Sequence, residues 1–242
     1  MTGELEPVHS ADHQVEYVEV ARARSERGEI VLRQRRDLDA PHGAPAALEL
    51  RVNGVFVMDT LETTSETALA RAALEQVSSP TSVLVGGLGL GFTVREVLAD
   101  KRVENVVVAE IEDALVRWFR DGTVPHGRPF IADGRLSISV ADIQQVVNES
   151  ADDAFDLVLL DVDNGPDFLV FEGNAGIYES LFLQQVRRTL RTGGVVAVWS
   201  STKSQRLTEA MTEVFGGCTT ASHPVVLQGR DDEFWLHLAR SG

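Results

Sequence analysis

The chain has 242 residues, with 37 acidic against 22 basic side chains and a formal net charge of −15. This charge disfavours a polyphosphate partner, so nucleic-acid binding is not expected, and it would instead attract a cationic substrate. The hydrophobic content of 43% allows one substantial domain with its own core, while a single cysteine and unclustered histidines predict neither a disulfide framework nor a metal site.

The first 14 residues are polar and aperiodic, and we expect a disordered tail there. They contain no basic segment followed by an apolar run, so no signal peptide is expected. Because no apolar run in the chain is long enough to cross a bilayer, we expect no membrane partner and a cytoplasmic location.

Residues 15–60 have the alternating pattern of β-strands. Strand-like runs occupy 15–20, 29–33 and 48–57, and the last of these contains an Asn53-Gly54 turn signal. The pattern predicts a small antiparallel β-unit over 15–60, followed by an α/β domain over 61–242.

The second part begins with a predicted helix over 64–77 and then alternates apolar runs with helical patterns. Apolar runs buried on both faces and separated by helices predict a doubly wound, mostly parallel sheet. Two final strand-like runs at 224–227 and 233–238 predict a terminal hairpin. A hairpin closing such a sheet resembles class I methyltransferase-like, Rossmann-like domains, so seven strands are expected.

A glycine-rich loop lies directly after the first of these strands and opens a helix. Its glycines, Gly86, Gly87, Gly89 and Gly91, would let the backbone approach a ligand closely. Glu110 follows the next strand, 19 residues after Gly91, where an acidic residue accepts hydrogen bonds from ribose hydroxyls. A solvated carboxylate at a strand end is the simpler alternative.

The spacing of the glycines favours S-adenosylmethionine over other nucleotides. A dinucleotide loop needs G-x-G-x-x-G, but Phe92 stands at the place of the third glycine, so NAD is disfavoured. No Lys-Ser/Thr pair follows the glycines, which argues against ATP.

Two more acidic positions follow strands of the predicted sheet. Asp142, with Ile143 beside it, would contact the adenine, although Asp is also a common helix N-cap. Asp161 and Asp163 follow the fourth strand, at the end of a sheet where ligands bind, and would orient a nucleophile or accept its proton. The same segment, with Asn164 and a following Gly-Pro, would otherwise be a simple turn.

Over residues 53–201 the sequence resembles the spermidine synthase family. The resemblance is carried by the glycine loop, by Glu110-Ile111-Glu112, by the strand ending at Asp161, and by the segments 177–182 and 190–195. It implies a transferase that uses S-adenosylmethionine or its decarboxylated form, with Ile111 at the nucleotide and a proton-accepting aspartate at Asp161. Asp163, Asn164 and Tyr178 are then candidates for binding a small-molecule acceptor.

Two departures from the family pattern affect the expected reaction. The segment after Asp161 is shorter than the family's Asp-x-x-Asp-Pro-x-Gly-Pro, and the helix before the glycine loop lacks the family's Tyr and His. We therefore expect methyl transfer to a small molecule. Aminopropyl transfer from decarboxylated S-adenosylmethionine to a polyamine is the alternative, and a non-catalytic nucleotide-binding module is the second.

The β-unit before the core often mediates pairing in this family. The apolar run from Val55 to Met58 would supply a contact surface for a homodimer, or would pack on the chain's own core. We expect a dimer.

Overall fold

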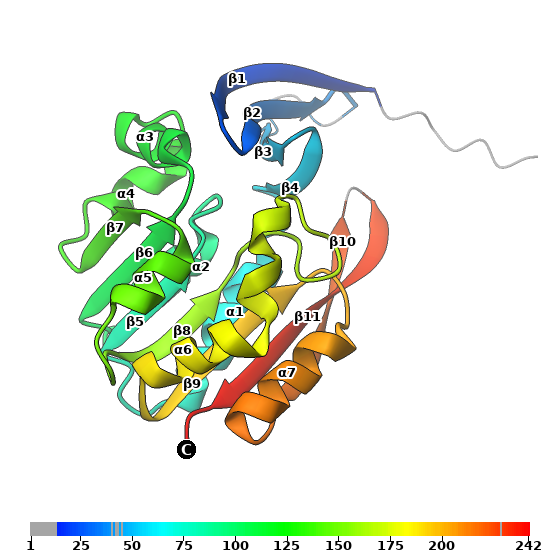
Figure 1. Ribbon diagram of the computed structural model, residues 1–242. Helices are drawn as coiled ribbons and strands as arrows, with labels where there is room; N and C mark the ends of the chain where they lie inside the picture. Colours follow the sequence, from blue (N-terminus) through cyan, green and yellow to red (C-terminus); the bar gives the residue numbers. More distant parts are fainter. Residues whose placement is uncertain (1–13, 40, 42–43, 45, 228) are drawn as a thin grey trace, which may run out of the picture.

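The computed structural model describes residues 14–39, 41, 44, 46–227 and 229–242. Two sheets organise these residues, a small one of four strands and a large one of seven (Figure 1). The predicted N-terminal tail, except for Gln14, lies outside the described residues.

The small sheet is an antiparallel meander of β1 (Val15–Ser25), β2 (Gly28–Asp37), β3 (Ala47–Val52) and β4 (Val55–Asp59). The Asn53-Gly54 turn joins β3 to β4 as predicted. Both residues have positive φ, 52° and 79°, which Asn and Gly adopt most easily among the amino acids.

The large sheet has the strand order β10-β11-β9-β8-β5-β6-β7. The five strands β5 (Ser82–Gly86), β6 (Asn105–Glu110), β7 (Leu136–Val140), β8 (Phe155–Leu160) and β9 (Leu190–Ser200) run parallel. The terminal hairpin of β10 (Thr219–Leu227) and β11 (Arg230–Arg240) adds two strands, with β11 antiparallel to β9. This arrangement confirms the predicted seven-stranded, mostly parallel sheet with a small N-terminal β-unit.

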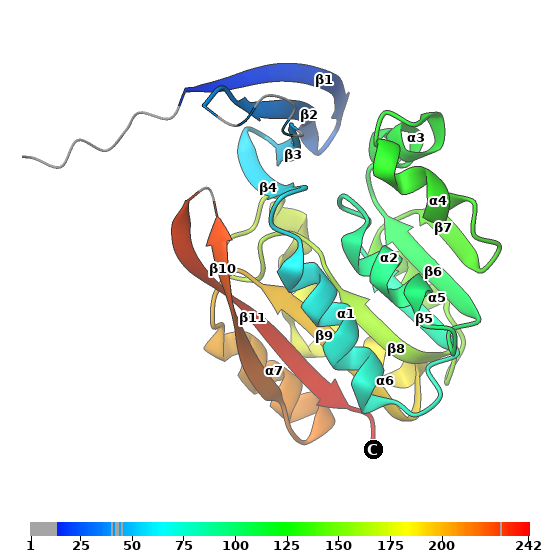
Figure 2. The same ribbon diagram turned by 180° about the vertical axis from the view of Figure 1, so that it is seen from behind.

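Helices cover both faces of the large sheet. One face packs against α1 (Thr64–Gln76), α2 (Phe92–Ala99) and α3 (Asp113–Asp121), which Figure 2 shows from their side; the other packs against α5 (Ile143–Glu149), α6 (Ser180–Thr189) and α7 (Gln205–Phe215). Alternate residues of β8 pack in the two cores on opposite faces of the sheet. Leu157 and Leu159 belong to the core that includes α1, and Val158 and Leu160 to the core that includes α6. This two-sided burial explains the unbroken apolar run in the sequence.

Shorter helical segments complete the chain: the 3-10 turns η1 (Pro125–Gly127) and η2 (Glu172–Tyr178), and α4 (Arg128–Ile131). No helix among the described residues is both long and apolar enough to cross a membrane. The small sheet lies over the end of the large sheet where β5, β6 and β8 finish (Figures 1 and 2). Ligand sites of open α/β sheets occur at this end.

Candidate functional site

A cavity lies between the carboxyl ends of the parallel strands and the small sheet. Its floor comes from the segments after β5, β6, β7 and β8, and its roof from β2, β3 and β4. We call it the nucleoside cavity, after the ligand expected from the sequence. Its lining residues are Arg27, Ile30, Leu50, Val52, Val57, Gly87, Gly89, Ala109, Glu110, Ile111, Glu112, Leu115, Ala141, Asp142, Ile143, Asp161, Val162, Asp163, Val170, Phe171 and Asn174.

Two glycines of the loop after β5 lie at the wall of this cavity. Gly87 has φ +91°, and a Cβ there would come within 2.1 Å of the backbone oxygen of Asp161. Gly89 has φ +49°, and a Cβ there would come within 2.7 Å of the sulfur of Met58 in β4. The loop therefore needs glycine for both its conformation and its close contacts. Gly86 and Gly91 lie behind the wall, where they allow close packing of neighbouring side chains.

Glu110 ends β6 and organises the glycine loop. One oxygen of its carboxyl accepts the backbone N–H of Leu88 at 2.8 Å and the other accepts that of Glu112 at 2.7 Å. The side chain is buried, and burial raises its pKa against the effect of these two amides. Each oxygen keeps a second lone pair that can accept a hydrogen bond from a hydroxyl group.

Asp142 serves as a helix cap and lines the cavity at the same time. One of its oxygens accepts the N–H of Gln144 at 2.8 Å, which caps α5, while Asp142 and the adjacent Ile143 both belong to the cavity wall. The cap leaves the other carboxyl oxygen available to a ligand. Ile111 lines the same wall and offers apolar surface for a flat ring.

A second, smaller cavity adjoins the first. The two share Val57, Gly89, Asp161 and Asp163. We call it the acceptor cavity, after the acceptor substrate expected from the sequence. It is lined by Phe56, Val57, Met58, Asp59, Glu62, Glu66, Gly89, Asp161, Asp163, Trp199, Leu227 and Phe234. Among these described residues are five carboxylates and no cationic side chain.

Two of these carboxyls, those of the half-buried Asp161 and the buried Glu66, form an acidic pair. Asp161 accepts a hydrogen bond of 2.6 Å from the hydroxyl of Thr93 at the start of α2, and Glu66 accepts one of 2.8 Å from Ser65. Burial raises the pKa of Asp161 to about 6, and burial together with the charge of Asp161 raises that of Glu66 to about 8. Because Thr93 favours the charged form of Asp161, Asp161 ionises first.

Asp163, predicted to bind or activate a substrate, has its hydrogen-bonding capacity taken by its own loop. It has φ +62°, and its oxygens accept the N–H groups of Asn164, Val170 and Phe171 and the side-chain amide of Asn174. Asp163 therefore holds its own loop together, although it also lines both cavities.

The structure places Asn164 and Tyr178 away from both linings. The side-chain amide of Asn164 donates to the carbonyl of Phe56 at 3.4 Å, which ties the loop to β4. The hydroxyl of Tyr178 donates to the carbonyl of Val162. Both residues support the segment that carries Asp161, and neither is among the described residues that line the two cavities.

Several residues at the site were not singled out from the sequence. Glu66, Trp199 and Phe234 belong to the acceptor cavity. Arg27, from the turn between β1 and β2, donates to the carboxyl of Glu112 at 2.8 Å and closes one side of the nucleoside cavity. A detectable signal was the group of acids Asp59, Glu62 and Glu66, whose last member lies 20 residues before Gly86, whereas Arg27 gave none. Among the described residues no group of three or more His, Cys, Asp or Glu is arranged to hold a metal ion.

Comparison with known proteins identifies the family. The spermine/spermidine synthase domain matches residues 62–216. A polyamine aminopropyltransferase of Aeropyrum pernix is 30% identical over 156 residues, which are 60% of this chain and 49% of that protein. One from Thermoanaerobacter sp. strain X514 is 35% identical over 120 residues, or 49% of this chain and 40% of that protein. The chain thus spans less than half of the length of these relatives.

The fold has matching solved structures. A spermidine synthase in complex with the transition-state analogue AdoDATO superposes with a TM-score of 0.79 at 17% identity, covering 100% of this chain and 84% of that one. At this identity the likeness concerns the fold.

The names of the relatives also correct one expectation. Methyl transfer to a small molecule, the reaction expected from the sequence, is wrong, because the relatives are named for aminopropyl transfer. The missing Tyr and His before the glycine loop suggested a different reaction, but the acids of 59–66 line the acceptor cavity all the same. The match over residues 62–216 shows that the chain belongs to the spermine/spermidine synthase family.

Proposed function

We propose that the protein transfers an aminopropyl group from decarboxylated S-adenosylmethionine to a primary amine, the reaction class for which its relatives are named. The observation that carries this proposal is the junction of the two cavities at Asp161. A cavity suited to a nucleoside meets a pocket lined by carboxylates at the half-buried Asp161. Such a pocket attracts a cationic amine and holds it beside the nucleoside.

The nucleoside cavity has suitable groups for the adenosine part of this donor. Glu110 would accept hydrogen bonds from the ribose hydroxyls, and the free oxygen of Asp142 would accept one from the adenine amino group. Ile111 and Ile143 would contact the faces of the adenine ring, and Gly87 and Gly89 would let the backbone approach the sulfur-bearing part. Asp163 would reach the ligand space only at its edge, while Asn164 and Tyr178 would act by positioning the loop.

The reaction needs an unprotonated amine nitrogen in line with the carbon–sulfur bond. The nitrogen lone pair attacks the propyl carbon next to sulfur, the carbon–sulfur bond breaks, and its electron pair stays on sulfur, which yields neutral methylthioadenosine. Asp161 would accept the proton that the nitrogen loses, and Thr93 would keep Asp161 in its charged form until the amine arrives. The sulfonium is already activated, so alignment accounts for much of the catalysis.

The charge of the acceptor cavity also selects the form of the donor. Intact S-adenosylmethionine carries a carboxylate that the decarboxylated form lacks. Next to Asp161 and Glu66 that carboxylate would be repelled, and no cationic side chain among the described lining residues of this cavity offsets the repulsion. The decarboxylated donor presents only an ammonium at this place, which the acids attract.

The test is release of methylthioadenosine from decarboxylated S-adenosylmethionine in the presence of a panel of primary amines. We expect release with the wild type and a loss of at least about a hundredfold in Asp161→Asn, with methylthioadenosine binding retained, as for removal of a general base. Glu172→Gln, an exposed acid of the same segment, is the matched control. Binding of methylthioadenosine without release with any amine would refute the proposal and leave a nucleotide-binding module.

A homodimer remains part of the proposal. Val55 is 46% exposed in β4, whereas Phe56, Val57 and Met58 turn partly inward and all three line the site. Light scattering at micromolar concentration, giving twice the chain mass of 26.4 kDa, would support it, and a single chain mass would refute it.

A further inference from the structure

The terminal hairpin reaches the start of α1 through one histidine. β10 packs beside α1, and Figure 2 shows the two elements next to each other. Nε2 of His223 in β10 lies 2.9 Å from the hydroxyl oxygen of Thr64, the first residue of α1. The helix itself lacks the family's Tyr and His, and the fold brings a histidine to its first turn from 159 residues further along the chain.

This histidine begins a chain of hydrogen bonds that ends at a carboxylate of the acceptor cavity. Both the backbone N–H and the hydroxyl of Thr64 donate to the same oxygen of Glu62. Since a hydroxyl has one hydrogen and Thr64 gives it to Glu62, the hydroxyl oxygen accepts from an N–H at Nε2 of His223. The chain therefore runs from His223 through Thr64 to Glu62.

Glu62 is held by this chain and is still able to bind a ligand. Its side chain is half-buried and lines the acceptor cavity. Thr64 occupies one carboxyl oxygen, which leaves the other available to an ammonium group. Because an unrestrained glutamate samples several rotamers, fixing one oxygen in advance lowers the entropy that is lost when the other binds an amine.

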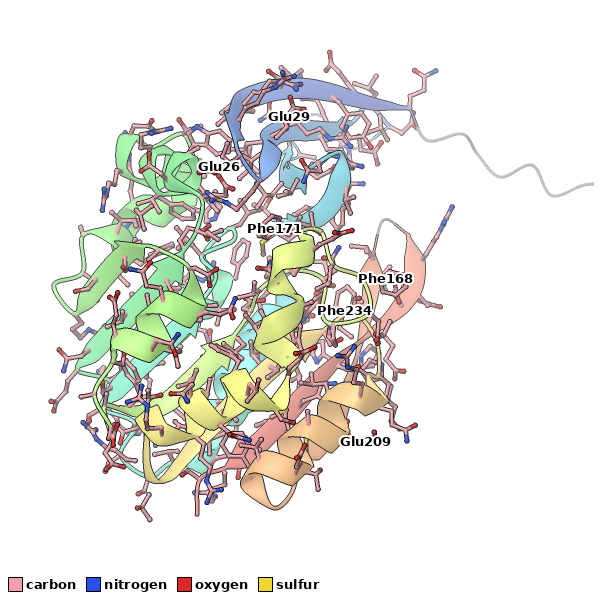
Figure 3. The ribbon with its side chains drawn as sticks, in the orientation of Figure 1. Glu26, Glu29, Phe168, Phe171, Glu209 and Phe234 are labelled. Atoms are coloured by element: carbon pink, nitrogen blue, oxygen red, sulfur yellow. The ribbon has the colours of Figure 1, made fainter. Side chains whose placement is uncertain are left out.

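The position of His223 is set by the hairpin. His223 pairs with Phe234 across β10 and β11, and residues paired in this way project from the same face of a sheet. Phe234 lines the acceptor cavity, and Figure 3 shows it at the end of the large sheet that faces the small sheet. Its ring packs on that of Trp199 with 4.8 Å between the centroids, so this part of the hairpin has a fixed place beside the cavity.

We propose that His223 is a positioning residue for the acceptor amine, and that it acts on Glu62 through the hydroxyl of Thr64. The proposal rests on the proposed function and adds to it a residue that lines neither cavity. Without the N–H of His223 the hydroxyl of Thr64 is free to turn, Glu62 loses its fixed orientation, and the amine binds more weakly. Asp161 and the nucleoside cavity lie outside the chain of hydrogen bonds, so donor binding and the chemical step are unaffected.

The test is the steady-state rate of methylthioadenosine release at saturating decarboxylated S-adenosylmethionine and varied putrescine, or the amine of the panel that reacts fastest. We expect His223→Leu to raise KM for the amine about three- to tenfold, the effect of one hydrogen bond, with kcat and the affinity for methylthioadenosine nearly unchanged. His223→Gln, whose side-chain amide can donate in place of Nε2, should restore most of the wild-type KM. A loss of folded protein lowers kcat but leaves KM unchanged, so KM carries the result.

A second variant tests the path through Thr64. Thr64→Val removes the hydroxyl that joins the two residues, and in this background His223→Leu should have no further effect on KM. The control is Ser222→Ala, at an exposed neighbour in β10, which should leave KM unchanged.

Three results would overturn the role of His223 and leave the proposed function intact: an unchanged KM in His223→Leu, additive effects of the His223 and Thr64 changes, or an equal loss of methylthioadenosine affinity, which would indicate a general structural role. No release by the wild type with any amine would overturn both.

Discussion

Replacing Glu66 by glutamine should make the protein more stable at high pH and leave it nearly unchanged at low pH. In the folded protein, burial and the charge of Asp161 raise the pKa of Glu66 from 4.5 to about 8. Below pH 4.5 the carboxyl is neutral in both the folded and the unfolded chain. As the pH rises toward 8 the unfolded chain ionises more readily, so the free energy of unfolding falls.

The size of the effect follows from the shift. A change from 4.5 to about 8 corresponds to roughly 5 kcal/mol at about 1.4 kcal/mol per pKa unit. Entry of water and movement of the side chain relieve part of this cost once Glu66 ionises, so we expect a stabilisation of about 2 kcal/mol or more at pH 9. Glutamine avoids the ionisation and can still accept the hydrogen bond from Ser65.

Urea unfolding followed by tryptophan fluorescence at pH 5, 7 and 9 measures this difference. The control is Glu75→Gln, an exposed glutamate of the same helix, whose effect should not vary with pH in this way. If Glu66→Gln differs from the wild type by the same amount at pH 5 and at pH 9, Glu66 does not carry a raised pKa, and the acidic pair is not as described.

Three further outcomes are expected. In Thr93→Val the hydroxyl that favours ionised Asp161 is lost, so the pKa of Asp161 rises. The acid limb of the pH–activity profile should therefore move up by about one pH unit, as measured by methylthioadenosine release from pH 5 to 9. In Glu110→Gln one acceptor oxygen near the ribose becomes a donor, and calorimetric titration should show about tenfold or weaker binding of methylthioadenosine; unchanged affinity would remove Glu110 from the nucleoside site. In Gly89→Ala the new Cβ meets the sulfur of Met58 at 2.7 Å and the residue must adopt a left-handed conformation, so both thermal stability and nucleoside affinity should fall. The additional change Met58→Ala removes the contact but not the backbone strain, so it should restore only part of the lost stability and affinity.

The large sheet could be predicted from the sequence because its signals are local. The run Leu157–Leu160 is apolar throughout, since its residues alternate between two cores, and this pattern is typical of a parallel strand covered on both sides. The glycine loop and Glu110 are likewise defined by short spacings along the chain. The nucleoside cavity contains both.

The acceptor cavity could not be predicted in the same way, because its residues meet only in the folded chain. Phe56, Glu66, Trp199 and Phe234 come from β4, α1, β9 and β11, which are far apart in sequence. A glutamate in the first turn of a helix is also an ordinary feature, favoured by the helix dipole, so Glu66 taken alone gave no distinct signal, although the group of acids over 59–66 did. For Asp163 the sequence suggested more than the structure shows. Its place after a strand predicted a ligand contact, whereas its oxygens accept hydrogen bonds from its own loop.

The segment from Phe56 to Glu66 joins these observations into one argument about specificity. It begins in the small sheet, where Met58 contacts Gly89 and receives the N–H of Leu90 at 3.1 Å, so β4 is fixed directly to the glycine loop. The chain then continues into α1 and brings Glu66 to the acceptor side of that same loop. A segment outside the glycine motif thereby joins the nucleoside cavity to an acidic cavity, which in the proposed reaction would hold the acceptor. The glycine motif therefore predicts a nucleoside site, and in the proposed reaction the residues before it would position the amine.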